Sequence, residues 1–245
     1  MLALIPARSG SIRIPNKNIY SINDHPLIAY TITSAISSKI FDEIIVCTDS
    51  KEYAEIAKYY GADVPSLRPA SISQKDSPDC EWVKWILDLN QNKFLKYEIA
   101  FILRPTNPFR TSDTIKRAYS SFLNSDADTL RAIKPVSEHP GKMWVYQQEK
   151  IVPLIPLSIS NVPLHSNQTN KLFDVYIQDA SLEIFSIKNF LKTNSITGSS
   201  IMPFISSSYE GFDLNTPNDL IIMDQLIKNN RVEMTKIDKK PWFSK

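Results

Sequence analysis

Residues 2–18 read LALIPARSGSIRIPNKN, a short apolar run followed by a polar stretch rich in cations. The apolar run, residues 2–6, has the length and composition of one buried strand. The polar stretch, residues 7–18, is typical of a loop, and a helical pattern begins at Pro26 and lasts to about Ser38. This part of the chain therefore predicts a strand, a long loop and a helix.

The same alternation continues along the chain. Strands are predicted at residues 43–48, 62–65, 99–103, 129–134 and 176–186. Helices are predicted at residues 51–60, 79–90, 112–124 and after Thr216, which caps a final helix together with Asp219. Strands that alternate with helices indicate an α/β fold with a mainly parallel sheet.

Length and composition restrict the class of protein. A chain of 245 residues with 42% hydrophobic content is long enough for one large core, so we expect a single domain over residues 1–245. The formal charge is only +2, because basic and acidic residues nearly balance, and this does not favour a protein that binds nucleic acid through its phosphates. The N-terminus does not resemble a signal peptide, and no apolar run has the length of a membrane span. Cys47 and Cys80 lack metal-like spacing, which favours reduced thiols in a cytoplasmic protein.

Two segments depart from the alternation. Prolines at 135, 140, 153, 156 and 163 interrupt residues 135–174, which have little helical periodicity, so this segment is expected to leave the sheet. The basic tail after Lys236 is expected to be loosely held.

The loop after the first strand carries the strongest chemical signal. In open parallel sheets, ligands bind beyond the carboxyl ends of the strands, and this loop rises from such an end. Gly10 stands between Ser9 and Ser11, which favours backbone N–H groups turned toward an anion, and Arg8, Arg13 and Lys17 add three cations. The fingerprints of dinucleotide-binding and P-loop proteins are absent. The loop therefore predicts a triphosphate site of another kind.

Several motifs in order resemble the acylneuraminate cytidylyltransferase family. They are IPAR (5–8), GSIR (10–13), PNKN (15–18), TDS (48–50), RPA (68–70), RPTNPFR (104–110) and DLNTPNDL (213–220). The resemblance covers nearly the whole chain. It implies a three-layer α/β/α Rossmann-like nucleotidyltransferase fold, with residues 135–175 as a protruding dimerisation arm of a homodimer.

The resemblance also implies a reaction, transfer of CMP from CTP to the anomeric hydroxyl of an acidic 2-keto sugar of the sialic, legionaminic or pseudaminic type. Lys17 and Arg8 would be catalytic by holding the triphosphate, and Asn18 and Arg68 would contact the cytidine part. Mg²⁺ would bridge the phosphates, because hard oxygen-rich anions recruit it. The predicted nucleotide-binding residues are Ala7, Arg8, Ser9, Gly10, Arg13, Lys17, Asn18 and Arg68, and the metal ligands are Asp213 and Asn215.

The sugar is expected at the end of the predicted strand 99–103. Arg104 stands where relatives that activate sialate commonly have glutamine, and its guanidinium could form a paired contact with a substrate carboxylate. The predicted substrate-binding residues are Arg104, Thr106, Asn107, Arg110, Tyr176 and Gln178.

Two positions depart from the family pattern. Ile12 replaces a common lysine, and Asn215 replaces an acid, so its amide oxygen would bring no charge to a metal. Two other hypotheses therefore stand beside the enzyme: a paralogue that binds a sugar nucleotide without catalysis, and a nucleotidyltransferase that uses another nucleotide and sugar.

Overall fold

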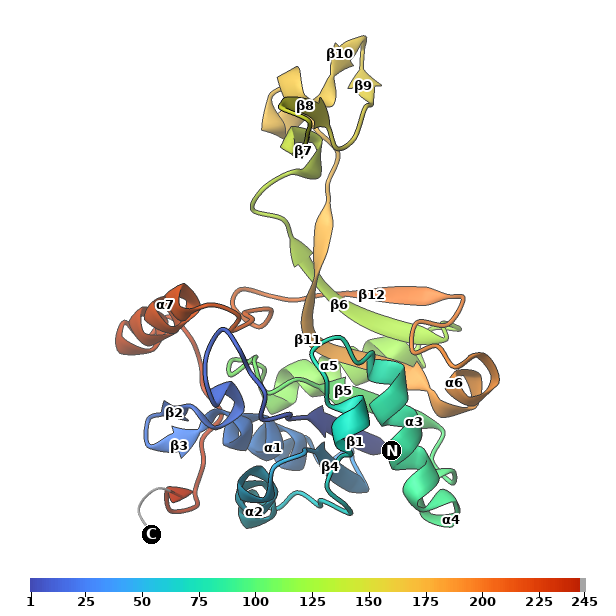
Figure 1. The fold of residues 1–245 in the computed structure, drawn as a ribbon, viewed down its shortest axis with the longest axis vertical. Coiled ribbons are helices and arrows are strands. Elements are labelled where there is room, and N and C mark those ends of the chain that lie inside the picture. Colours follow the sequence, from blue (N-terminus) through green and yellow to red (C-terminus); the bar gives the residue numbers. More distant parts are fainter. Residues whose placement is uncertain (243–245) are drawn as a thin grey trace. The chain divides into compact units, whose positions relative to one another are not determined.

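A six-stranded sheet organises the larger of two structural units (Figure 1) in a computed structural model, which describes residues 1–242. The strand order is β12-β6-β11-β5-β1-β4. β1 (Leu2–Pro6) pairs in parallel with β4 (Glu43–Cys47) on one side and β5 (Ile99–Leu103) on the other. β11 (Tyr176–Ser186) is antiparallel to β5, and β6 (Thr129–Pro135) and β12 (Ile201–Ile205) complete the sheet. The predicted α/β class is confirmed, and the sheet is mixed.

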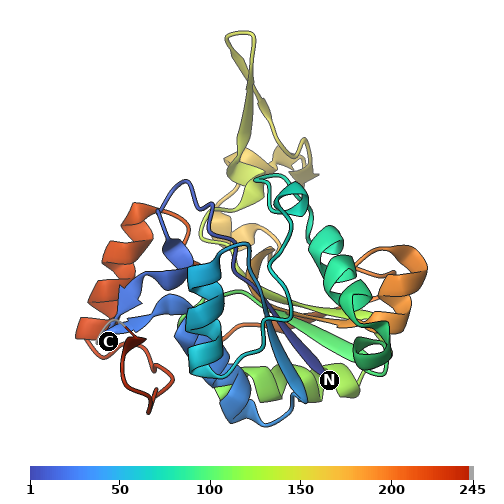
Figure 2. The same ribbon diagram turned by 60° about the horizontal axis from the view of Figure 1, so that its bottom comes forward.

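Helices cover both faces of this sheet (Figure 2), which makes three layers. On one face, α1 (Leu27–Ser38), α2 (Lys51–Tyr60) and α5 (Ser112–Leu123) pack against Ala3 and Ile5 of β1. On the other face, α3 (Asp79–Leu89), α4 (Gln91–Phe94) and α6 (Ile187–Thr193) pack against Leu2 and Leu4. Alternate side chains of one strand thus enter two separate cores. This is why the first apolar run has no polar face.

A third apolar cluster lies beside the sheet and joins the first loop to the last helix. It contains Ile14 of the loop, Leu27 and Tyr30 of α1, Leu214, and Met223 of α7 (Pro217–Lys228). A capping box between Thr216 and Asp219 begins α7, as predicted. Because Leu214 is fully buried in this cluster, the neighbouring residues 213 and 215 are held against the loop after β1.

The structure corrects three expectations about local structure. Residues 62–65 form one isolated bridge, between Ile45 and Asp63, instead of a strand. α6 and β12 were not predicted, because neither segment shows a long periodic pattern. Residues 237–242 of the tail are docked and not loose, and residues 243–245 lie outside the described part of the chain. The Tyr59 hydroxyl donates to the Lys240 carbonyl at 2.9 Å, and the Trp242 N–H donates to the Tyr60 hydroxyl at 3.2 Å. Apolar contacts of Ile237 and Trp242 with the core hold it.

Residues 133–178 form a compact unit of their own, in the stretch predicted to leave the sheet. This second unit contains the hairpins β7 (Trp144–Gln147) with β8 (Lys150–Pro153) and β9 (Ser158–Ile159) with β10 (Val162–Pro163). Their two-residue turns, 148–149 and 160–161, have positive φ at both positions, as type I′ turns require. Three short 3₁₀ helices complete the unit: η3 (Pro140–Lys142), η4 (Leu164–Ser166) and η5 (Thr169–Lys171).

The remaining elements of the first unit are short. η1 (Lys17–Ile19) ends the first loop, β2 (Ser21–Ile22) and β3 (His25–Pro26) form a hairpin before α1, and η2 (Ala70–Ile72) precedes α3. Within residues 1–242, none of the helices has the length and apolar character needed to cross a bilayer.

Candidate active site

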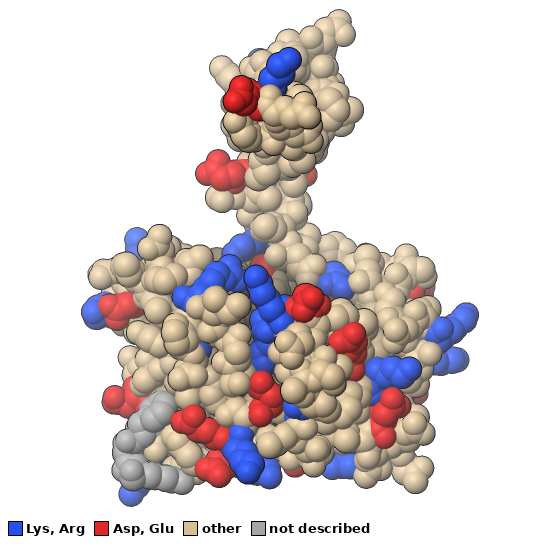
Figure 3. All heavy atoms as spheres, in the orientation of Figure 1, with Lys and Arg blue, Asp and Glu red and all other residues tan. Residues whose placement is uncertain are grey.

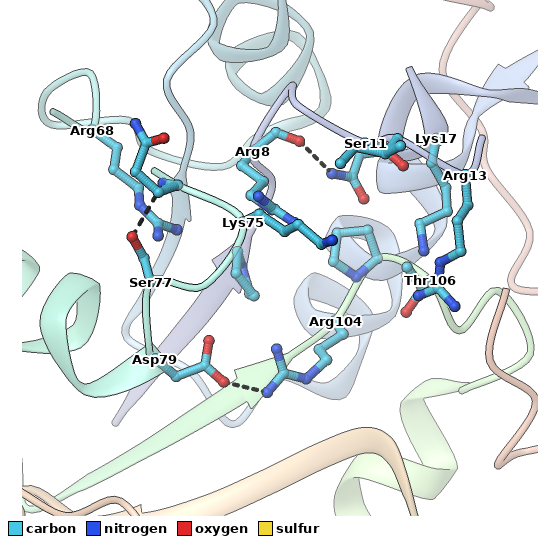
Figure 4. Close-up of a pocket in the computed structure, with 15 residues that line it drawn as sticks. Arg8, Ser11, Arg13, Lys17, Arg68, Lys75, Ser77, Asp79, Arg104 and Thr106 are labelled. Carbon is cyan, nitrogen blue, oxygen red and sulfur yellow. Dashed lines mark hydrogen bonds and ion pairs between the residues drawn. The ribbon is translucent and has the colours of Figure 1, made fainter. Parts of the chain in front are cut away.

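A cleft of about 580 Å³ opens at the carboxyl ends of β1 and β5, where a parallel sheet is expected to bind its ligand (Figure 4). Its walls come from the loop after β1, the segment that leads into α3, and the loop after β5. Figure 3 shows Lys and Arg side chains gathered in a band on this face of the first unit. The lining residues are Pro6, Arg8, Ser11, Ile12, Arg13, Lys17, Asn18, Arg68, Gln74, Lys75, Ser77, Asp79, Arg104, Pro105 and Thr106.

The loop after β1 is held in shape by contacts at three points. The carboxylate of Asp49 accepts from the Ser9 N–H at 2.7 Å and from the Ser9 hydroxyl at 3.1 Å. The Asn18 amide donates to the Arg8 carbonyl at 3.0 Å and closes the loop across its base. Ile14 is buried in the third apolar cluster. With its backbone fixed this way, the loop presents Arg8, Arg13 and Lys17 to the cleft.

Lys17 lies between the loop and the segment around residue 213. Its Nζ donates to the Leu214 carbonyl at 2.6 Å. Burial lowers the pKa of Lys17, and the nearby carboxylate of Asp213 opposes that shift. Lys17 lines the cleft and Asp213 lies near enough to act on its charge, and their common role in one site stays a prediction.

Three residues predicted to bind nucleotide do not line the cleft. Ala7 is fully buried, and its N–H donates to the Cys47 carbonyl at 2.9 Å. Ser9 directs its N–H and hydroxyl to Asp49. Gly10 is exposed, and a Cβ added there would contact nothing within 4 Å. The Ala7 N–H and the polar groups of Ser9 thus hold the loop, and a nucleotide contact by these residues stays a prediction.

Arg68 does line the cleft, together with Asn18. Its Nε donates to the Ile72 carbonyl at 2.7 Å, and a second guanidinium nitrogen contacts the same oxygen. Its guanidinium carbon also lies 6.0 Å from the centroid of the Trp82 ring. Arg68 therefore braces the segment that contains η2, and it lies almost fully buried in the wall of the cleft.

The predicted metal ligands Asp213 and Asn215 contact each other. The Asn215 amide donates to Asp213 Oδ2, and its own oxygen accepts from Arg13 at 3.2 Å. That oxygen thus faces a cation, so Asn215 orients Asp213 and Arg13 instead of supplying a free ligand. Residues 1–242 contain no group of three His, Cys, Asp or Glu side chains suited to a metal. One carboxylate beside a polyphosphate cleft still fits Mg²⁺, which commonly binds one or two carboxylates together with substrate phosphates.

Arg104 is held between two carboxylates at the floor of the cleft. Its NH2 nitrogen lies 2.5 Å from Asp79 Oδ2 and 3.0 Å from Glu183 Oε1. Burial lowers the pKa of Arg104, but the two carboxylates outweigh this and hold the pKa above its ordinary value. Glu183 also pairs with Arg131 at 2.7 Å.

Of the other residues predicted to bind sugar, only Thr106 lines the cleft. Asn107 is buried, and its amide donates to the Glu210 carbonyl. Arg110 is 1% exposed and donates to the carbonyls of Ser181 and Arg104 and to the Thr31 hydroxyl. These contacts make Arg110 a structural residue and correct its predicted substrate role.

Tyr176 and Gln178 belong to the second unit, at the start of β11, and both are exposed. Their predicted contact with substrate stays a prediction.

Sequence reasoning missed the segment that leads into α3. Gln74, Lys75, Ser77 and Asp79 all line the cleft, and the Gln74 N–H donates to the Ser77 hydroxyl at 3.1 Å. Figure 4 shows Lys75 reaching into the same space as Arg8. A polar stretch that contains Lys75, directly after the RPA motif, was the available signal, since it precedes a helix at the same edge of the sheet.

The arrangement is suited to a polyphosphate anion. Arg8, Arg13, Lys17 and Lys75 converge on one cleft, and the nearby carboxylate of Asp213 partly compensates the charge of Lys17. Fixed cations of this kind bind phosphate oxygens and stabilise charge that develops on a leaving group.

Comparison with known proteins agrees with this geometry. A cytidylyltransferase family model matches residues 2–182. CMP-N,N'-diacetyllegionaminic acid synthase of Legionella pneumophila is 30% identical over 233 residues, which cover 94% of this chain and 97% of that protein. Pseudaminic acid cytidylyltransferase of Campylobacter jejuni is 36% identical over 148 residues, 60% of this chain and 63% of that protein.

A solved structure shares the fold at low identity. CMP:2-keto-3-deoxy-manno-octonic acid synthetase complexed with CTP superposes with a TM-score of 0.64 at 13% identity, over 94% of this chain and 98% of that one. The family model spans the loop after β1, the RPA segment, and β5 with its loop, which are the parts that build the cleft. The chain belongs to the cytidylyltransferase family.

Proposed function

We propose that this protein transfers CMP from CTP to the anomeric hydroxyl of an acidic 2-keto sugar of the sialic, legionaminic or pseudaminic type. The observation that carries the proposal is the set of cations in one cleft, Arg8, Arg13, Lys17 and Lys75, beside the carboxylate of Asp213. Relatives named for CMP activation of legionaminic and pseudaminic acids support the choice of nucleotide and of sugar class.

In this reaction the anomeric oxygen attacks the α-phosphorus of CTP. A new P–O bond forms, the bond from the α-phosphorus to the bridging oxygen breaks, and pyrophosphate leaves with that electron pair. The hydroxyl proton passes to water in the open cleft. Lys17 and Arg8 hold the triphosphate and offset the charge that grows on the leaving pyrophosphate, so catalysis is mainly positioning and electrostatic stabilisation.

Other groups of the cleft divide the remaining tasks. Asn18 and Arg68 contact the cytidine part, Arg13 contacts a phosphate, and Asp213 would be the residue that holds Mg²⁺. When bound, Mg²⁺ supplies charge neutralisation at the phosphate oxygens. Arg104 and Thr106 face the sugar, with the Arg104 guanidinium directed to the sugar carboxylate.

The second unit is proposed to pair with a second copy of the chain as the arm of a homodimer. Several of its large apolar side chains are exposed to solvent: Tyr146 is 72%, Leu157 58% and Ile151 57% exposed. Exposed apolar side chains that lie together commonly mark a protein interface. Sedimentation of the full chain tests this, and a monomer at micromolar concentration would contradict it. The free thiols of Cys47 and Cys80 support a cytoplasmic location.

Two measurements test the activity. Thermal shifts with CTP, UTP, GTP and ATP in the presence of Mg²⁺ identify the nucleotide, because a ligand that binds the folded state raises the melting temperature. Pyrophosphate release from CTP with a panel of acidic 2-keto sugars then tests catalysis. We expect the largest shift with CTP and release with at least one sugar. Preference for another nucleotide would overturn the base assignment, and CTP binding with no release across the panel would indicate a binding protein.

A further inference from the structure

The guanidinium of Arg104 is already occupied by protein carboxylates. Both contacts, to Asp79 at 2.5 Å and to Glu183 at 3.0 Å, are made by the same nitrogen, NH2. A guanidinium offers two edges for paired hydrogen bonds to a carboxylate, and NH2 belongs to both. As Arg104 stands, a sugar carboxylate cannot form a paired contact with it unless one of the two protein carboxylates is displaced.

Glu183 is fixed on both sides and cannot be the one displaced. It lies on β11, between β5 and β6, and its second oxygen pairs with Arg131 NH1 of β6 at 2.7 Å. Its side chain is 3% exposed. A buried carboxylate that leaves such partners would lose them without replacement by water, which is strongly unfavourable.

Asp79 is in the opposite situation. Its side chain is 33% exposed, it lines the cleft, and it stands at the first position of α3. Its other oxygen accepts from the Trp82 indole N–H at 2.7 Å, so the carboxylate keeps a partner when it moves away from Arg104. A water-accessible carboxylate with a second donor can exchange at small cost.

We infer that Asp79 determines specificity for acidic sugars: it occupies the carboxylate position on Arg104 in the free protein and is displaced by the carboxylate of the sugar, while Glu183 positions Arg104. The inference rests on the proposed function. A sugar without a carboxylate has no group to replace Asp79 on Arg104, so the Asp79–Arg104 pair stays closed and such a sugar is disfavoured.

The experiment compares Asp79→Asn with its matched control Asp76→Asn. Asp76 is exposed in the same segment and does not line the cleft, so its replacement removes the same charge without touching Arg104. Removing the competing carboxylate is expected to lower KM for the acidic sugar by about tenfold, a change typical of one charged hydrogen bond. Asp76→Asn is expected to change that KM by less than about twofold, as exposed charges usually do.

Two further variants test whether Asp79 acts through Arg104. In an Arg104→Gln background, Asp79→Asn is expected to lose its effect on KM, because the guanidinium for which Asp79 and the sugar carboxylate compete is absent. Glu183→Gln is expected to raise KM for the sugar by about tenfold. If Glu183→Gln fails to fold, the Asp79 and Arg104 pair still decides the question. A higher KM in Asp79→Asn, or the same fall in the Arg104→Gln background, would overturn the inference. A parent protein that releases no pyrophosphate with any acidic sugar would instead overturn the proposed function.

Discussion

Lys17 donates from Nζ to the main-chain carbonyl of Leu214 at 2.6 Å, which joins two segments 197 positions apart in sequence. The bond connects the loop after β1 to the segment that carries Asp213, and Leu214 is itself fully buried. The cation and the carboxylate of the proposed site therefore share one rigid support.

Replacing Lys17 tests that support and the proposed chemistry together. Lys17→Met is expected to lower kcat/KM for CTP by about a hundredfold to a thousandfold, the usual cost of removing one electrostatic group that acts on the leaving charge. Steady-state pyrophosphate release measures it. Lys58→Met on the exposed side of α2 serves as the control and should match the parent. Parent-like kinetics for Lys17→Met would remove this residue from the site.

Lys75 is the cation that the motifs did not reveal. Lys75→Ala is expected to raise KM for CTP by about tenfold, because a charge-assisted contact to phosphate is lost. Lys84→Ala, on the exposed face of α3, is the matched control. If both variants keep the parent KM, Lys75 is a solvated side chain at the rim and not a ligand.

Metal binding is expected to depend on Asp213 and to respond to charge at position 215. Asp213→Asn should weaken Mn²⁺ binding in the presence of CTP by about tenfold or more, because metal sites lose at least this much when a ligand or its support is removed. Asn215→Asp should strengthen it, since a carboxylate replaces the amide that faces Asp213. Electron paramagnetic resonance of Mn²⁺ gives the free fraction without any turnover. Unchanged Mn²⁺ binding in Asp213→Asn would show that Asp213 is not a metal ligand.

Arg110 is expected to act on stability. Arg110→Met removes the donors to the carbonyls of Ser181 and Arg104 and to the Thr31 hydroxyl, and these buried acceptors lose that partner. Leaving a buried polar group unsatisfied typically costs about 1–3 kcal/mol of unfolding free energy, so a loss of at least this size is expected. Urea unfolding measures the loss. Unchanged stability with a large rise in KM for the sugar would restore the substrate role first predicted for this residue.

The buried environment of His25 is expected to make the protein less stable in mild acid. Burial lowers the pKa of His25 below its ordinary value of 6.5, and its Nδ1 contacts the Tyr60 hydroxyl at 2.9 Å. Folding thus favours the neutral ring: this contribution is complete above pH 6.5 and is lost as the pH falls from 6.5 through the folded pKa. His25→Gln should flatten that part of the pH profile of urea midpoints. An equal slope in parent and variant would contradict it.

Much of the fold could be predicted from the sequence because the signals were local. The apolar run of β1, the cap of α7 and the proline-rich stretch each depend on neighbouring residues. The strand expected at 62–65 failed because strand formation needs a partner, and only Asp63 finds one. β12 was missed because Pro203 interrupts a run of five residues whose partner strand is far away in sequence.

The site was predictable where a motif places side chains on one loop, and less so where distant segments meet. Arg8, Arg13 and Lys17 lie in the cleft as expected. The burial of Arg110, the contacts of Ser9 with Asp49 and the carboxylates around Arg104 depend on pairing between elements that no local pattern reveals. A residue type marks its chemistry, but only the fold decides which of its atoms are already engaged.

The docked tail also restricts how the protein can be shortened. Val232, Met234 and Ile237 lie over the cluster beneath α7, and the hydroxyl of Ser34 on α1 is 2.6 Å from that of Thr235. A fragment that stops at Lys228 would expose this apolar cluster to solvent and would tend to aggregate. A shortened form of the protein should therefore keep residues 229–237, although they form neither a helix nor a strand.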